Sequence, residues 1–192
     1  MSSNGFIETF TGKQFFFNAP TEDAIDIIDI AHSLSMQCRY SGHTKHFYSV
    51  AEHCCLLHDW YLDYHGVNYM SEKYAFECLM HDAGEAYLTD VPRPIKYCLP
   101  EYLEFEKKIE AVISKKFDLT HPIPDNVKLA DASILMDERA QAMSDSGHDW
   151  NLNLTPLGIT LQFWGPKVAE REFLKRYYAR TSIVERPCDS GK

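Results

Sequence analysis

The segment from residue 76 to residue 96, FECLMHDAGEAYLTDVPRPIK, places titratable side chains inside an apolar pattern. His81, Asp82, Glu85 and Asp90 lie within ten positions of one another. The residues around them recur at helical spacing and have the composition of a buried face, namely Phe76, Leu79, Met80, Ala83 and Ala86. A buried charged group without a partner costs several kcal/mol. A fold that buries this helix must therefore supply partners for its imidazole and carboxylates.

Apolar residues recur at intervals of three and four along most of the chain, which is typical of amphipathic helices. The pattern predicts helices over about residues 25–35, 45–64, 71–86, 101–117, 125–143 and 166–178. Asp125 is a candidate N-cap, and Pro166 fits the first turn of the last helix. The three prolines of DVPRPIKYCLP predict an ordered loop rather than a helix.

The N-terminal region has a different pattern. Residues 6–17, FIETFTGKQFFF, contain two apolar or aromatic runs around Thr11-Gly12 and predict a short hairpin. A chain of 192 residues is long enough to bury a substantial core and fits one domain. We therefore expect residues 1–192 to form a single all-α domain with a small N-terminal β-hairpin and a core over about residues 20–180.

The composition limits the partners of the chain. A formal net charge of −9 disfavours a general binder of nucleic-acid polymers or anionic membranes, although a local cationic site or a metal could still bind a small anionic substrate. No CxxC pair occurs, so we expect reduced, mostly structural thiols at Cys38, Cys54, Cys55, Cys78, Cys98 and Cys188. MSSNGFIETF lacks the pattern of a secretory signal, and no apolar run approaches about 18 residues. We therefore expect a cytoplasmic protein without a membrane partner.

Three His-Asp pairs occur, and their surroundings separate them. His148-Asp149 lies in a Ser/Gly/Asn-rich stretch, where Asp is ordinary turn chemistry. His58-Asp59 is expected near the end of its helix, and His53 lies five residues earlier, about 140° around the helix, so the two imidazoles diverge. That pair predicts a surface or helix-end feature. Only His81-Asp82 lies inside a predicted apolar helix. Glu85 follows His81 by four residues and Asp82 by three, so it lies on the same helix face.

A divalent cation would compensate buried imidazoles and carboxylates together, because it binds such ligands in their deprotonated form. Two other helices each offer one unexpected polar group in an apolar setting, His53 in YSVAEHCC and Asp131 in VKLADASILMDE. Taken singly, each could be a hydrogen-bonded core histidine or a paired aspartate. Three helices with one such group each favour a common ion.

The order His53, His81-Asp82 and Asp131 resembles the HD-domain superfamily of metal-dependent phosphohydrolases. The segments RYSGHTKHFYSVAEH, LMHDAGEAYLTDVPRPIK and VKLADASILMDE resemble small bacterial and phage members related to 5'-deoxynucleotidases, over about residues 8 to 143. The resemblance implies an HD-domain helical bundle that holds one divalent metal through His53, His81, Asp82 and Asp131. Two imidazoles and two carboxylates suit Co²⁺, Mn²⁺, Zn²⁺, Fe²⁺ and Ni²⁺ alike.

The resemblance also implies roles for residues near this metal. Glu85 and Asp90 match the family's water-handling carboxylates, although Glu85 could be an i,i+4 helix pair and Asp90 a turn cap. Arg39 matches an arginine that contacts the substrate phosphate. Tyr40 stands where the deoxynucleotidases have a tryptophan, and it could stack on a base or sugar.

Further cations are candidate substrate contacts. Lys96 and Arg93 follow the His-Asp segment, and His43, Lys45 and His46 form a basic cluster before His53. His46 lies seven residues before His53, so the two would share a face of one helix. The cluster could bind additional phosphates, or it could be a solvated helix start.

The resemblance favours a 5'-deoxynucleotidase that releases orthophosphate from a deoxynucleoside monophosphate. Three alternatives remain, namely a dNTP triphosphohydrolase such as a dATPase, a cyclic-nucleotide phosphodiesterase, and a non-catalytic nucleotide-binding domain. Related enzymes are often dimers, so a homodimer or higher homo-oligomer is also expected. Aromatic residues that could serve an interface, or pack internally, are Tyr61, Tyr64, Tyr177 and Tyr178.

Overall fold

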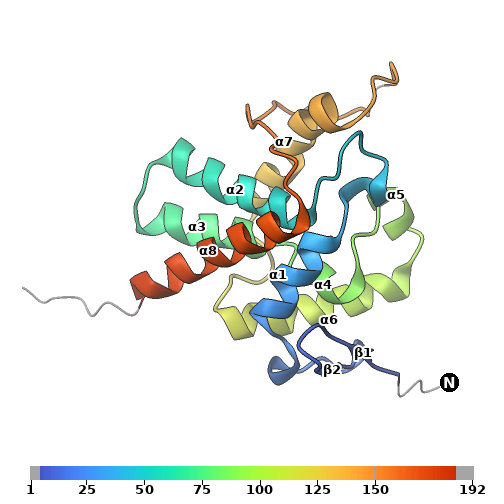
Figure 1. The fold of residues 1–192 in the computed structure, drawn as a ribbon, viewed down its shortest axis with the longest axis vertical. Helices are drawn as coiled ribbons and strands as arrows, with labels where there is room; N and C mark the ends of the chain where they lie inside the picture. The colour runs from blue at the N-terminus through green and yellow to red at the C-terminus, as the bar shows by residue number, and fades with distance from the viewer. Residues whose placement is uncertain (1–4, 149, 185–192) are drawn as a thin grey trace, which may run out of the picture.

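The computed structural model describes residues 5–148 and 150–184, and this part of the chain is mostly helical (Figure 1). The helices are α1 (Ile27–Met36), α2 (Val50–His65), α3 (Tyr69–Met80), α4 (Glu85–Leu88), α5 (Arg93–Lys96), α6 (Pro100–Phe117), α7 (Asp125–Ala142) and α8 (Pro166–Val184). Two short 3-10 helices, η1 (Glu22–Ala24) and η2 (Arg39–Gly42), flank α1. Strands β1 (Ile7–Glu8) and β2 (Gln14–Phe15) pair antiparallel, with Ile7 opposite Phe15. The all-α class and the N-terminal hairpin are thus confirmed.

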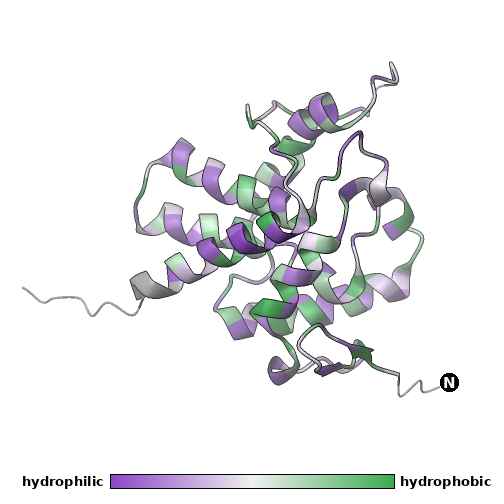
Figure 2. Ribbon diagram, viewed as in Figure 1, coloured by the Kyte–Doolittle hydropathy of each residue, from purple (hydrophilic) through white to green (hydrophobic). Residues whose placement is uncertain are grey.

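Helices α1, α2, α3 and α8 pack against one another, with α8 lying across α2 and α3 (Figure 1). In Figure 2 the helices are banded in green and purple along their lengths, as expected of helices that bury one face. The largest group of buried side chains joins these helices to β2 and α6, and includes Phe15, Ile30, Leu34, Val50, Leu79, Ile109 and Phe173. Each large apolar side chain buried here contributes about 1.5–3 kcal/mol. Within the described residues, none of the helices combines the length and apolar character needed to span a membrane.

A second group of buried side chains fixes α7 against α2 and α3. It includes Leu57 and Tyr61 of α2, Cys78 of α3, and Val127 and Ile134 of α7. This packing places α7 beside the C-terminal end of α3, although the two helices are far apart in the sequence. Tyr61 is therefore a core residue, whereas Tyr64 and Tyr178 are about half exposed or more and Tyr177 packs against the first group.

The predicted helix over residues 71–86 is divided in the structure. Helix α3 begins earlier, at Tyr69, because Asn68 and Ser71 form a reciprocal capping box. It ends at Met80, and residues 81–84 form turns closed by bonds from the Ala83 amide to the Met80 carbonyl and from the Glu85 amide to the Asp82 carbonyl. Short helix α4 follows. His81 and Asp82 therefore lie in the turns that join α3 to α4, although His81 keeps helical dihedral angles.

Four other predictions about the ends of elements differ from the structure. Helix α2 begins at Val50 rather than near residue 45, because the Ser49 hydroxyl accepts the Glu52 amide as its N-cap. Asp125 is the first residue of α7 and makes no capping hydrogen bond, since Pro124 occupies the cap position. The proline-rich loop contains one helical turn, α5, where Pro94 lies in the first turn and loses no helical bond. Helix α8 continues beyond residue 178 to Val184.

The remaining two His-Asp pairs lie elsewhere. Asp59 is in the middle of α2, not at its end, and its carboxylate accepts two hydrogen bonds from Arg176 of α8 at 2.8 and 2.5 Å. The pair therefore joins two helices. His148 lies in the irregular segment after α7, while Asp149 and Cys188 lie outside the described residues.

The irregular segment between α7 and α8 is held by buried side chains. Glu52 of α2 accepts the amides of residues 162–164 at 2.6–2.8 Å. Asp137 of α7 accepts the amides of Leu157 and Gly158 at 2.7 and 3.1 Å. Carboxylates that accept several backbone amides satisfy groups that a loop cannot pair within itself. This segment is consequently fixed over α2 and α7, next to the residues described below.

Candidate metal centre

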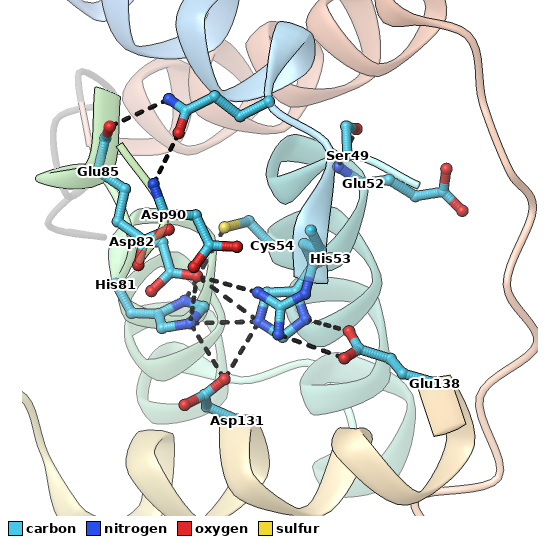
Figure 3. A network of polar contacts seen from close by, with 12 residues as sticks. Ser49, Glu52, His53, Cys54, His81, Asp82, Glu85, Asp90, Asp131 and Glu138 are labelled. Atoms are coloured by element: carbon cyan, nitrogen blue, oxygen red, sulfur yellow. Dashed lines mark hydrogen bonds and ion pairs between the residues drawn. The ribbon is translucent and has the colours of Figure 1, made fainter. Parts of the chain in front are cut away.

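Four side chains from three parts of the chain meet at one point (Figure 3). His53 comes from the first turn of α2, His81 and Asp82 from the turn after α3, and Asp131 from the middle of α7. His53 Nε2 lies 3.4 Å from His81 Nε2, 3.8 Å from Asp82 Oδ2 and 3.2 Å from Asp131 Oδ1. His81 Nε2 lies 3.2 Å from Asp82 Oδ2 and 3.6 Å from Asp131 Oδ1. The structure therefore brings together all four residues that the sequence singled out as ligands.

Hydrogen bonds fix the orientation of both imidazoles. His81 Nδ1 donates to the Cys78 carbonyl at 2.7 Å, and a carbonyl can only accept. His53 Nδ1 donates to Glu138 at 2.7 Å. Both rings therefore direct Nε2 toward the cluster. Metal-bound histidines are held in the same way by a bond from the other ring nitrogen.

The spacing and the donor chemistry fit one divalent ion. The ligand atoms of His53, His81 and Asp82 all lie within 4.8 Å of one another, and Asp131 adds a second carboxylate. Nitrogen and oxygen ligands lie about 2.0–2.2 Å from a transition ion, so neighbouring ligands around it are about 3–3.5 Å apart. The measured separations of 3.2–3.8 Å are close to that range. A His₂Asp₂ set without cysteine suits several transition ions equally.

The charges of the cluster also favour a cation. Burial would raise the pKa of Asp82, but His81 outweighs it and lowers this pKa to about 2. Despite the same burial, hydrogen bonds from His53 and His81 lower the pKa of Asp131 well below its usual range. Burial would lower the pKa of His81, but Asp82 raises it well above its ordinary value. Two ionised carboxylates thus attract positive charge to the point where both Nε2 atoms face.

Glu138 is the largest element of the site that sequence reasoning missed. Its fully buried carboxylate lies behind His53 and accepts from the hydroxyls of Tyr40 and Tyr48 and from Arg39 Nη2, besides His53 Nδ1. Burial would raise the pKa of Glu138, but the charge of Arg39 and then of His53 lowers it to about 2. The sequence VKLADASILMDE could have indicated this role for Glu138. Glu138 follows Asp131 by seven residues and therefore shares its helix face.

We expect Glu138→Gln to weaken binding of a divalent metal by roughly 10- to 100-fold, the usual effect of losing a group that orients a metal ligand. The amide of glutamine cannot accept from all these donors, so His53 loses its fixed orientation. A titration with Co²⁺ or Mn²⁺ measures the change. Glu77→Gln is the matched control, because Glu77 is also buried but accepts the Thr120 amide away from the cluster. Unchanged metal affinity in Glu138→Gln would contradict this role for Glu138.

The two carboxylates predicted to handle water lie next to the cluster. Glu85 begins α4, and its buried Oε2 has no hydrogen-bond partner among the described residues, while Oε1 lies 3.8 Å from Lys96 Nζ. Burial, and then the charges of Asp82 and Asp90, raise the pKa of Glu85 well above its usual value. Burial also raises the pKa of Asp90. Gln37, which the sequence did not single out, donates to the Glu85 carbonyl and accepts the Asp90 amide, and so holds the two together.

A cavity of about 700 Å³ opens beside the cluster. Its wall includes Asp82 and Asp131 of the cluster, and both Glu85 and Asp90. The other residues that line it are Arg39, Tyr40, Val91, Pro92, Arg93, Pro94, Lys96, Tyr97, Leu135, Trp150 and Leu152. Four predicted substrate contacts are therefore placed at this cavity, namely Arg39, Tyr40, Arg93 and Lys96.

Lys45 and His46 do not line this cavity, and neither does His43. All three are exposed, and the His46 ring packs edge-on against Phe163 at 5.2 Å. The prediction that His46 shares a face with His53 required both to lie on one helix. Because α2 begins only at Val50, the seven-residue spacing does not align them.

Comparison with known proteins supports a nucleotide phosphohydrolase. Residues 32–146 match a family model described as 5'-deoxynucleotidase YfbR-like, a span that contains the whole cluster. The uncharacterized protein YfdR of Escherichia coli K12 is 44% identical over 145 residues, 76% of each chain. An uncharacterized protein of Rhodobacter capsulatus is 32% identical over 124 residues, 62% of each chain. A 5'-deoxynucleotidase of Photorhabdus laumondii is 29% identical over 115 residues, 50% of this chain and 58% of that protein.

Proposed function

Because the chain belongs to the YfbR-like 5'-deoxynucleotidase family, we propose that it hydrolyses deoxynucleoside 5'-monophosphates and releases orthophosphate. One observation carries the proposal. Asp82 and Asp131, half of a cluster suited to a divalent ion, line a cavity of about 700 Å³ that also contains a buried arginine. This volume lies within the usual range for small-molecule sites, and the pairing of a metal with a guanidinium suits a phosphate ester.

His53, His81, Asp82 and Asp131 would hold one divalent metal. When bound, such an ion polarises a phosphoryl oxygen and lowers the pKa of a bound water toward neutrality. The two imidazoles and two carboxylates leave Co²⁺, Mn²⁺, Zn²⁺, Fe²⁺ and Ni²⁺ as candidates.

Arg39 would bind the substrate phosphate. Its guanidinium is held between two carboxylates, with Nη2 3.3 Å from Glu138 and Nη1 3.6 Å from Asp82. Although burial would lower the pKa of Arg39, Glu138 raises it well above its usual value, so the group stays charged. A guanidinium carries five N–H donors, and its only hydrogen bond among the described residues is that from Nη2 to Glu138, so donors remain for a phosphate oxygen.

Glu85 and Asp90 would handle protons and water in the reaction. Asp90 positions or deprotonates the attacking water, and Glu85 orients this water or helps to protonate the leaving oxygen. Burial and two neighbouring carboxylates raise the pKa of Glu85 well above its usual value and so favour its protonated form, which suits a group that donates a proton.

A dNTP triphosphohydrolase is less well supported by the geometry. That alternative drew on the resemblance to phage members and on the basic residues His43, Lys45 and His46, and none of these three lines the cavity. The cations that do line it besides Arg39 are Arg93 and Lys96, and Lys96 is engaged by Glu106 at 2.6 Å. The geometry thus provides more readily for one phosphate than for three.

The test is metal-dependent release of product from a panel of nucleotides. With Co²⁺ or Mn²⁺ we expect orthophosphate and a deoxynucleoside from dNMP substrates, and no triphosphate from dNTPs. The same reactions with excess chelator are the control. Release of triphosphate would establish the alternative activity. If neither orthophosphate nor triphosphate is released with any of the five candidate metals, the proposal of a metal-dependent nucleotide phosphohydrolase is refuted.

A further inference from the structure

The cavity beside the cluster has walls of two kinds. One part of the wall is charged and consists of Arg39, Asp82, Glu85, Asp90, Arg93, Lys96 and Asp131. The apolar part consists of Val91, Pro92, Pro94, Tyr97, Leu135, Trp150 and Leu152. A phosphate placed at Arg39 would use the charged wall. The rest of a nucleotide would then meet the apolar one.

Trp150 is the largest side chain on the apolar wall, and its orientation is fixed. The Arg139 guanidinium lies over the indole ring, 5.2 Å from its centroid, and also donates to the His148 carbonyl. A single arginine at the end of α7 thus holds the backbone and the ring of this segment. Trp150 thus lines the cavity while Arg139 lies over its ring.

Trp150 lies next to the residue that follows the phosphate-binding arginine. The rings of Trp150 and Tyr40 are 5.9 Å apart at an angle of 46°. The Tyr40 hydroxyl donates to Glu138, and Tyr40 has a positive φ of 56°, which is rare for a bulky residue. Backbone strain of this kind persists where surrounding structure fixes it, often at ligand sites. Tyr40 therefore connects Arg39 and the cluster to Trp150.

The segment that carries Trp150 is also anchored on both sides. Upstream it leaves α7 at Ala142, whose carbonyl accepts the Lys45 amide at 2.8 Å. Downstream, Asp137 and Glu52 accept the amides of residues 157–158 and 162–164. An aromatic ring held in this way loses little conformational freedom when a ligand stacks on it.

We propose that Trp150 determines binding of the nucleobase, by stacking its indole on the base of the nucleotide whose phosphate lies at Arg39. This inference rests on the proposed function. Arg139 is then a positioning residue that holds the indole. Stacking between a base and an aromatic side chain is worth a factor of roughly 5 to 150 in affinity.

The test compares a substrate that has a base with one that lacks it. We expect Trp150→Ala to raise KM for dAMP by about tenfold or more, while kcat/KM for 2-deoxyribose 5-phosphate stays within about twofold of wild type. Trp150→Phe, which keeps a ring, is expected to retain most of the affinity for dAMP. Leu154→Ala is the matched control, because Leu154 lies in the same segment but does not line the cavity.

The possible outcomes separate this inference from the proposed function. If Trp150→Ala loses kcat/KM equally for dAMP and for 2-deoxyribose 5-phosphate, the stacking role is overturned. It is also overturned if kcat/KM is unchanged for both substrates. If Trp150→Ala fails to fold, Trp150→Leu replaces it, and unchanged KM for dAMP in a folded Trp150→Leu protein overturns the inference. Hydrolysis of both substrates by the wild type with equal KM would reject a base site but leave the phosphohydrolase standing. Hydrolysis of neither would reject both.

Discussion

Asp82→Ala is expected to abolish binding of a divalent metal and, with it, phosphate release. Asp82 Oδ2 lies 3.2 Å from His81 Nε2 and 3.8 Å from His53 Nε2, so the substitution removes one of two carboxylates facing both imidazoles. Losing even a group that only orients a ligand costs 10- to 100-fold in affinity, so losing a ligand is expected to cost at least roughly 100-fold. Metal content after dialysis and phosphate release from dNMP substrates measure the two effects.

Asp59→Ala is the matched control for this variant. Asp59 also follows a histidine, but its carboxylate pairs with Arg176 and lies outside the cluster. We expect this protein to bind metal as the wild type does, with some loss of thermal stability because α2 and α8 lose an ion pair. A full complement of metal in Asp82→Ala would show that the cluster of His53, His81, Asp82 and Asp131 does not bind the ion in the proposed way.

The features that the sequence predicted share a physical origin. Helical periodicity is set by burial of one face, so the long helices α6 and α7 could be placed within one or two residues of their observed bounds. His53, His81 and Asp131 were recognisable because each is a polar group in an apolar setting, and burial makes such groups costly unless they are paired. They meet because α2, α3 and α7 pack against one another, and because the turn that follows α3 lies between the other two helices.

The features that it did not predict depend on contacts between distant residues. The turns at residues 81–84 interrupt a continuous helical pattern, and nothing in the local sequence demands a break except Gly84. Glu138 was overlooked because a Glu near a helix end is ordinarily exposed, and its four donors come from segments 85 to 99 residues away. Trp150 lies in an irregular segment, where no periodicity indicates which side chains face inward.

The start of α2 had the largest consequence for function. A helix from residue 45 would place His46 over His53 and provide cations for several phosphates. The Ser49 cap starts the helix at Val50 instead, and residues 43–49 follow a path set by the bridge between Cys38 and Ser49. A displacement of five residues in one helix boundary thus weakens the triphosphate alternative and leaves the monophosphate, which the sequence already favoured, as the candidate substrate.

Glu85→Gln is expected to reduce kcat by roughly 10²- to 10⁴-fold while the protein keeps its metal. The substitution preserves shape but removes a proton that can be exchanged. Glu85 is not part of the cluster, and its Oε2 is buried without a partner among the described residues, so the side chain is available to a water or a leaving oxygen at the cavity wall. Metal content, KM and kcat for a dNMP substrate distinguish this effect from the loss expected of Asp82→Ala.

Two comparisons show whether Glu85 itself carries the proton transfer. Glu72→Gln, in the first turn of α3 and away from the cavity, is the matched control and is expected to keep wild-type kcat. Asp90→Asn tests the other carboxylate, which Gln37 holds close to Glu85 through their backbones. Wild-type turnover by Glu85→Gln together with a large loss in Asp90→Asn would assign the water and the leaving oxygen to Asp90 alone. If both variants lose turnover and both keep metal, the two carboxylates divide the proton transfers between them.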